Sequence, residues 1–320
     1  MGKSLPLDFS PLKFCGEARA GHGEDNWCFG FTEDAGVVAV FDGCGGSGAR
    51  QHKLYADHSE AYMASRLCAG AVFECVQKHY PCQEPVEEFV QQTLWPYIRQ
   101  RLMANVPPTG SLRISGLRTL PSTMAAALIR MCDGGEVEIC TVWAGDSRVY
   151  LLDSTGLSQL MIDDTNQPDP QEGLYDDGTL MNVICTDRPV KLNCRTIRVK
   201  PPFVVLAASD GCFGYVSTPM EFEGMILHTM LETQNVAQWE DHLQKLIASF
   251  AGDDHTMVLA SFGFGNFEAM QRHFAPRNAH LKTEYLDTVW ATPWEDREVR
   301  RKLWATYRKN YMKYIESEQA

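Results

Sequence analysis

VEICTVWAGDSRVYLL, residues 137–152, is the stretch that decides the fold. Its two apolar runs, 137–143 and 149–152, have the length and the Val and Ile content of buried strands. Gly145 and Asp146 lie between the runs and leave no room for the crossover that parallel neighbours need. We therefore expect these two strands to be antiparallel neighbours.

Apolar runs of the same kind, bounded by Gly or Asp, recur at 37–41, 125–129, 203–207 and 257–262. Helical periodicity appears at 55–79, with a break near Gly70, and at 86–106 and 236–250. Thr218, Pro219 and Glu221 form a capping box that opens a further helix. Helices segregated from a meander of antiparallel strands predict an α+β sandwich and not a doubly wound parallel sheet.

The last 40 residues have a different pattern. The helix-start signature recurs at 292–295, and one apolar stripe follows at Val299, Leu303, Tyr307, Tyr311 and Ile315. Seven basic side chains surround this stripe, namely Arg297, Arg300, Arg301, Lys302, Arg308, Lys309 and Lys313. Such a helix either packs on its own acidic domain or docks on a partner or an acidic ligand, and packing is the commoner outcome.

Charge and composition exclude several classes of protein. The chain has 320 residues, 29 basic and 41 acidic, and its formal charge of −12 argues against a nucleic-acid or anionic-membrane binder. No apolar run approaches the roughly 18 residues that cross a bilayer, and the N-terminal residues contain no signal-peptide core. The eleven cysteines include no CxxC pair, which indicates reduced thiols in a cytoplasmic protein.

Acidic residues lie where the predicted strands end. Asp42, Asp146, Asp210 and Asp253 occupy such positions beside a glycine, and Glu24 and Asp25 lie upstream of the first run. Any one of them alone is most often a turn or cap residue. Bunched together, they would repel one another and be costly to desolvate, and a hard divalent cation removes both costs. Oxygen ligands without a His/Cys cluster favour Mg²⁺, Mn²⁺ or Ca²⁺ over zinc.

At these residues the chain resembles the metal-dependent type 2C Ser/Thr protein phosphatases, the PPM family. The segments that carry the resemblance are 19–26, 40–46, 122–125, 143–148, 160–165, 206–211 and 252–256. They run in the family's order over about residues 14–263, and as a set they are a strong signal although each alone is weak. The compact size and the short segment 164–195 favour a prokaryotic member.

The resemblance implies a four-layer α/β/β/α sandwich, two antiparallel sheets flanked by helices. It implies a type 2C phosphatase-like catalytic domain at 1–265, followed by a helical C-terminal extension at 266–320. It also implies two divalent cations, Mn²⁺ or Mg²⁺, at one end of the sheets, and a third, weaker site.

The resemblance further implies a role for each site residue. Asp42 would bridge the two metals, and Gly43 would offer its carbonyl. The second metal's shell would be completed by Glu24, Asp210 and Asp253, and Asp146 would help bind the third metal. Asp25 would hold water at the metals, and Arg19 would contact the substrate phosphate. The implied reaction is hydrolysis of phosphoserine and phosphothreonine in proteins by a metal-activated water, with no covalent phosphoenzyme.

Three departures from the family pattern matter. Arg19 stands one residue further from Glu24 than is usual. Cys44 occupies the place of a histidine that many members carry, and a buried thiol is a poor general acid, with His22 and His255 as possible substitutes. The third is a short segment with six acidic side chains, at Asp163, Asp164, Asp169, Glu172, Asp176 and Asp177. It would either select basic phosphopeptides or be an ordinary solvated loop, and solvation is the commoner outcome.

Two other functions compete with the phosphoprotein phosphatase. One is an inactive module that binds a phosphoprotein, for instance the target of a Ser/Thr kinase, without turnover. Such a module would be expected to have lost a metal ligand, yet Glu24, Asp42, Asp210 and Asp253 are all present. The other is a small-molecule phosphohydrolase, which the sequence leaves open because specificity depends on the groove and not on the fold.

Overall fold

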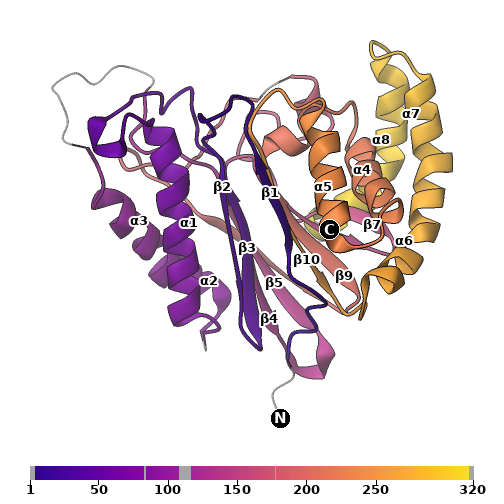
Figure 1. The fold of residues 1–320 in the computed structure, drawn as a ribbon, viewed down its shortest axis with the longest axis horizontal. Helices are drawn as coiled ribbons and strands as arrows, with labels where there is room; N and C mark the ends of the chain where they lie inside the picture. The colour runs from indigo at the N-terminus through magenta and orange to yellow at the C-terminus, as the bar shows by residue number, and fades with distance from the viewer. Residues whose placement is uncertain (1–3, 83, 108–116, 177, 317–320) are drawn as a thin grey trace.

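The computed structural model describes residues 4–82, 84–107, 117–176 and 178–316. Within them, two five-stranded antiparallel sheets pack face to face, and helices cover the outer face of each sheet (Figure 1). This confirms the predicted α+β sandwich. In the same residues, no helix has both the length and the apolar character needed to cross a membrane.

Each sheet is antiparallel throughout. One sheet has the order β1-β10-β9-β6-β7, formed by Leu12–Gly16, His255–Phe262, Phe203–Ala208, Arg148–Asp153 and Gly156–Gln159. The other has the order β2-β3-β4-β5-β8, formed by Asn26–Phe31, Ala35–Phe41, Met124–Met131, Val137–Ala144 and Asn193–Val199. The six predicted apolar runs are all strands, whereas β1, β2, β7 and β8 were not predicted.

The helices divide between the two outer faces. The β2–β8 sheet is covered by α1 (Glu60–His79), α2 (Val86–Phe89) and α3 (Trp95–Met103). The β1–β7 sheet is covered by α4 (Pro219–Leu231), α5 (Val236–Ala248), α6 (Phe267–Leu281), α7 (Asp287–Ala291), α8 (Arg297–Tyr311) and α9 (Lys313–Glu316). Figure 1 shows the first group on one side of the strands and the second group on the other.

The alternation of side chains along a strand explains the layers. In β3, Val37 and Ala39 pack on the helices of one face, while Val38 and Val40 pack on the other sheet. In β6, Tyr150 and Leu152 face the helices, whereas Val149 and Leu151 face the opposite sheet. Because both faces of these strands are buried, their sequences are continuous apolar runs.

The expected pairing of the two strands in 137–152 is wrong. β5 pairs with β4 and β8 in one sheet, whereas β6 pairs with β7 and β9 in the other. The turn therefore carries the chain between the sheets, and Gly145 has a φ of 107° there. A Cβ at Gly145 would lie 2.8 Å from the Thr123 side chain. The same crossing places Asp146 between the ends of the two sheets.

Two predictions for the helices that cover the β2–β8 sheet need correction. α1 begins after Ser59, whose Oγ accepts a hydrogen bond from the Tyr62 N–H at 3.0 Å, and it runs without a break through Gly70. The 86–106 periodicity corresponds to α2, a π-helical turn and α3 in succession. The capping box of α4 is confirmed, although the Glu221 carboxylate reaches the Ser217 N–H, at 2.7 Å, and not Thr218.

The C-terminal helix begins later than predicted and is rotated. Its N-cap is Asp296, and its buried positions are Arg300, Trp304, Tyr307 and Tyr311. Arg300 can be buried because its guanidinium donates to the carbonyls of Pro293 (2.7 Å), Trp294 (3.2 Å), Asp296 (3.1 Å) and Thr292 (2.9 Å) and to Ser217 Oγ (3.1 Å). The aromatic face of α8 thus packs in the same core as β6 and α4.

Candidate metal centre

The antiparallel registers bring the predicted acids to one end of the sandwich. β3 ends where β2 begins, and β9 ends where both β6 and β10 begin. A hydrogen bond of 2.7 Å from Ser209 Oγ to Asp25 Oδ2 joins the two sheets at this end. Side chains from distant parts of the sequence therefore meet here, as the strand-end pattern predicted.

Asp42 lies at the centre of this cluster. Its backbone is fixed by the segment before β4, since its N–H donates to Thr123 Oγ1 at 3.2 Å and its carbonyl accepts from the Thr123 N–H at 2.7 Å. Burial raises the pKa of the Asp42 carboxyl well above its ordinary value, and Asp25, Asp210, Asp146 and Asp253 raise it further. The cluster is therefore short of positive charge.

Asp25 and Asp146 show the same effect. Burial, opposed by the Ser209 hydrogen bond and reinforced by Asp210, raises the pKa of Asp25 to about 7. Burial and then Asp210 and Asp163 raise the pKa of Asp146 to about 8. Asp146 Oδ1 is buried and has no hydrogen-bond partner among the described residues. An unpaired buried carboxylate oxygen in an acidic cluster is suited to bind a cation.

Glu24 reaches the cluster from a loop that Asp254 holds in place. Asp254 accepts hydrogen bonds from the backbone N–H groups of Ala18, at 2.8 Å, and Glu24, at 2.6 Å. Burial raises the pKa of Glu24, and the hydroxyl of Ser59, which donates to its carboxylate, opposes that rise. Asp254 was not among the predicted site residues, although its position directly after Asp253 could have indicated a role at the site.

Glycines let the backbone approach the acids. A Cβ at Gly43 would lie 2.6 Å from the Ala61 carbonyl oxygen and 2.8 Å from that of Glu24. A Cβ at Gly45 would lie 2.1 Å from Glu24 Oε2. Gly43 therefore excludes a larger residue, because both carbonyls belong to the backbone, whereas a side chain at position 45 would displace the Glu24 carboxylate.

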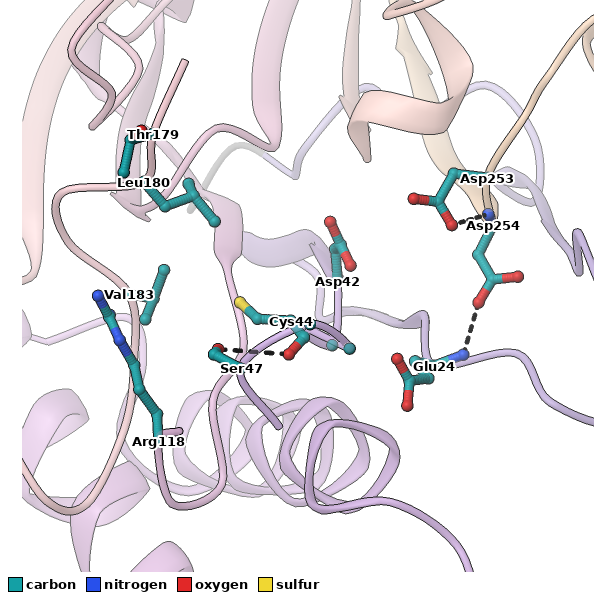
Figure 2. A pocket seen from close by; sticks show the side chains of 13 residues that line it. Glu24, Asp42, Cys44, Ser47, Arg118, Thr179, Leu180, Val183, Asp253 and Asp254 are labelled. Carbon is teal, nitrogen blue, oxygen red and sulfur yellow. Dashed lines mark hydrogen bonds between the residues drawn. The ribbon is translucent and has the colours of Figure 1, made fainter. Parts of the chain in front are cut away.

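Two cavities adjoin the cluster and share Asp253. The larger, of about 560 Å³, is lined by Glu24, Asp42, Asp253 and Asp254 on its acidic side and by Cys44, Arg118, Thr179 and Val183 elsewhere (Figure 2). The smaller, of about 340 Å³, is lined by Asp146, Asp163 and Asp210. Figure 2 shows the Asp42 and Asp253 carboxylates directed into the space between them.

The donor set suits a hard cation, but the side chains do not close around one. Within the described residues, no three Asp, Glu, His or Cys side chains are placed so that they could hold one metal ion. Glu24 and Asp25 are instead engaged by the hydroxyls of Ser59 and Ser209. Mg²⁺ and Mn²⁺ prefer such carboxylate oxygens as ligands. The raised pKa values of Asp42 and Asp146 and the unpaired oxygen of Asp146 are consistent with such a cation.

The remaining sequence-predicted residues lie outside the cavities. Arg19 is exposed in the loop after β1, at the same end of the sandwich, and lines neither cavity. Its contact with a substrate phosphate stays a prediction. His22 is exposed, and His255 is buried with its Nδ1 3.2 Å from the Asp253 carbonyl oxygen. Neither histidine lines either cavity.

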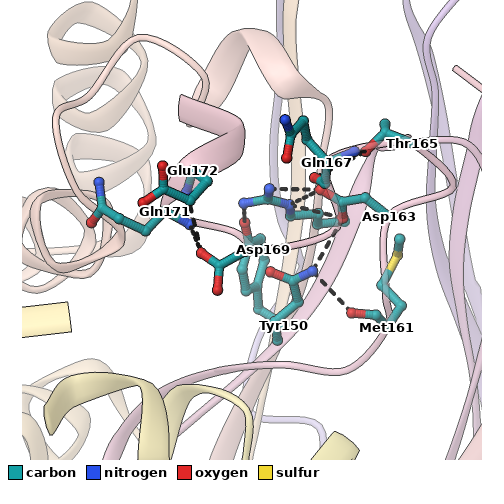
Figure 3. Close-up of polar contacts among 10 residues, drawn as sticks. Tyr150, Met161, Asp163, Thr165, Gln167, Asp169, Gln171 and Glu172 are labelled. Atoms are coloured by element: carbon teal, nitrogen blue, oxygen red, sulfur yellow. Dashed lines mark hydrogen bonds and ion pairs between the residues drawn. The ribbon is translucent and has the colours of Figure 1, made fainter. Parts of the chain in front are cut away.

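The acidic segment is neither a solvated loop nor a free acidic surface. Asp163 is buried and pairs with Arg148 at 2.7 Å (Figure 3), and Asp164 accepts from Asn182 at 2.6 Å. Two others pair with α8: Asp169 with Arg308 at 2.9 Å and Glu172 with Arg301 at 2.7 Å. Asp176 is exposed, and Asp177 lies outside the described residues. Three of the six acids, Asp163, Asp169 and Glu172, are therefore paired with arginines of the same chain.

Comparison with solved structures identifies the fold. The serine/threonine phosphatase PstP/Ppp of Mycobacterium tuberculosis has a TM-score of 0.58 and 19% identity, over 79% of this chain and 98% of its own. Stp1 of Staphylococcus aureus has a TM-score of 0.59 and 18% identity, over 82% and 99%. The catalytic domain of PstP in complex with two manganese ions has a TM-score of 0.52 and 18% identity, over 79% and 97%.

No protein-family model matches the chain, and neither does any curated protein. At these identities the likeness establishes the fold and leaves activity to experiment. The predicted resemblance to the type 2C phosphatases, in a form shared with bacterial members, is confirmed at the level of the fold. The chain therefore has the fold of the bacterial Ser/Thr protein phosphatases.

Proposed function

We propose that this chain is a cytoplasmic, metal-dependent phosphatase that hydrolyses phosphoserine and phosphothreonine in proteins. The observation that carries the proposal is the meeting of Asp25, Asp42, Asp146, Asp210 and Asp253 at one end of the sandwich, beside an open cavity. The proposed catalytic domain is 1–265, with 266–320 as its helical extension.

The proposed division of roles follows the resemblance. Glu24, Asp42, Asp146, Asp210, Asp253 and the Gly43 carbonyl would hold the divalent cations. When bound, the cations would lower the pKa of a water molecule and offset the charge on the phosphoryl oxygens. Asp25, whose carboxylate accepts a hydrogen bond from Ser209, would also accept one from such a water, and Arg19 would bind the phosphate from the exposed loop.

One assay separates this function from its competitors. Wild-type protein is given p-nitrophenyl phosphate and a phosphothreonine peptide, with Mn²⁺ and with EDTA. We expect hydrolysis of both substrates with Mn²⁺ and none with EDTA. Activity that survives EDTA would contradict the two-metal mechanism. Binding of the phosphopeptide without any hydrolysis would favour the inactive module, and hydrolysis of small phosphate esters alone would favour a small-molecule phosphohydrolase.

Cys44 predicts how the rate depends on the leaving group. Its thiol lines the larger cavity, and burial, followed by Asp42, raises its pKa well above the ordinary value. Such a thiol protonates an alkoxide poorly, whereas an aryl oxide needs little protonation. We expect Cys44→His to raise kcat on the phosphothreonine peptide about tenfold or more and to change kcat on p-nitrophenyl phosphate less than twofold. Cys44→Ala is the matched control, and an equal change on both substrates would contradict the assignment.

A further inference from the structure

Among the described residues, the lining of the larger cavity includes one positively charged side chain. Its other charged lining residues are Glu24, Asp42, Asp253 and Asp254, all acidic, and Arg118 is the exception. Figure 2 shows Arg118 on the opposite side of the cavity from Glu24 and Asp253, with Asp42 and Cys44 between them. The cavity is therefore polarised, with its acids at one end and a guanidinium at the other.

The backbone holds Arg118 in place while its side chain stays available. The Arg118 N–H donates to the Ser47 carbonyl at 2.9 Å, and the next residue, Thr119, donates its N–H to Asp187 Oδ1 at 3.0 Å. Among the described residues, the guanidinium of Arg118 makes neither an ion pair nor a hydrogen bond. Arg118 is half-buried beside the cavity, and its five N–H groups have no hydrogen-bond acceptor among those residues. Such a guanidinium is suited to bind an anion.

The surroundings offer Arg118 no acidic partner from the neighbouring acidic segment. Asp169 and Glu172 are occupied by Arg308 and Arg301 of α8, and Asp163 is occupied by Arg148. The wall near Arg118 is formed by Thr179, Leu180 and Val183, which carry no charge. Asp187, the acid that contacts the residue next to Arg118, accepts the Thr119 N–H and forms no ion pair with Arg118 among the described residues. An anion of a bound molecule is therefore able to pair with the Arg118 guanidinium.

We propose that Arg118 binds a second anionic group of the substrate, the carboxylate of an acidic residue that flanks the phosphorylated one. This inference rests on the proposed function, which places the phosphoryl group at the acidic end of the cavity. A guanidinium binds a carboxylate through two parallel hydrogen bonds. The chain would thus prefer acidic phosphopeptides, and not the basic ones that were one of the two alternatives for the acidic segment.

The test uses two phosphothreonine peptides that differ only at the flanking positions, Glu in one and Gln in the other. Dissociation constants are measured by fluorescence anisotropy, and KM and kcat are measured with Mn²⁺. We expect the wild type to bind the Glu peptide about tenfold more tightly, and Arg118→Gln to reduce that ratio to about one. Arg99→Gln is the matched control, because Arg99 is exposed on α3 away from the cavity, and it should keep the wild-type ratio.

A charge reversal makes the test specific. Arg118→Glu should prefer a third peptide with Lys at the flanking positions, a result that a merely structural role of Arg118 would not produce. Equal binding of the Glu and Gln peptides by the wild type, or an unchanged ratio in Arg118→Gln, would overturn the proposal. Failure to hydrolyse any peptide would contradict the proposed function alone, because the binding ratios still decide the role of Arg118.

Discussion

Replacing Asp42 with asparagine should lower kcat/KM on a phosphothreonine peptide by about a thousandfold or more. Asp42 is the acid whose pKa is raised by all four of Asp25, Asp210, Asp146 and Asp253, so it lies at the centre of the cluster. An amide adds no negative charge and cannot bridge two cations as a carboxylate can. The measurement is steady-state hydrolysis over a range of Mn²⁺ concentrations.

Two controls separate a lost metal site from a damaged fold. Asp241→Asn removes the same charge from the exposed side of α5, where Asp241 pairs with Lys245, and activity should be unchanged. In EDTA, Asp42→Asn should unfold at a temperature no lower than the wild type, because the substitution removes a carboxylate from a mutually repelling group. Activity within tenfold of the wild type would contradict the central role of Asp42.

Replacing Glu223 with alanine should lower the free energy of unfolding by about 3–5 kcal/mol. Glu223 is fully buried on α4, and its carboxylate accepts from Arg277 of α6 at 2.6 and 2.9 Å and from the Tyr307 hydroxyl of α8 at 2.5 Å. One side chain therefore joins three helices. Its loss leaves the guanidinium of Arg277 buried without a counter-charge and the Tyr307 hydroxyl without its acceptor.

The same helix supplies the control for Glu223. Glu232 at the end of α4 is exposed and pairs only with His228 one turn earlier, so Glu232→Ala should cost less than about 0.5 kcal/mol. Both variants are measured by urea denaturation at constant pH. A loss below about 1 kcal/mol for Glu223→Ala would show that the buried network does not hold α6 and α8 to α4.

The sandwich could be predicted from the sequence because a strand that is buried on both faces is a continuous run of apolar residues. The strands β3, β4, β5, β6, β9 and β10 are continuous apolar runs for that reason. β8, at a sheet edge, mixes polar and apolar residues, with Arg195 and Arg198 among them, and both β8 and β2 are only partly buried. The signal of these strands was therefore too weak to separate them from loops.

Strand pairing was harder to predict than strand position. A tight turn between two apolar runs usually means a hairpin, but in a sandwich it can also carry the chain from one sheet to the other. The deciding factor is which edges are occupied: β5 already lies between β4 and β8, and β6 between β7 and β9. Local sequence contains no information about partners that are 50 or more residues away.

The candidate site shows a similar division. The acids were predictable because each lies at or near the end of an apolar run or upstream of one, and all but Asp25 adjoin a glycine. Arg118 was not, because it lies in a loop with no periodic pattern and only the tertiary structure brings it to the wall of the cavity that Asp42 lines. Likewise, nothing in the acidic segment indicates that two of its acids, Asp169 and Glu172, pair with arginines of α8.

Anomalous diffraction from crystals soaked in Mn²⁺ tests the central claim most directly. We expect two manganese peaks about 3.5–4 Å apart, with Asp42 between them and oxygen atoms of Glu24, Asp210 and Asp253 among the ligands. No peak at this end of the sandwich, or peaks only at other acidic residues, would contradict the claim that these carboxylates form a metal centre.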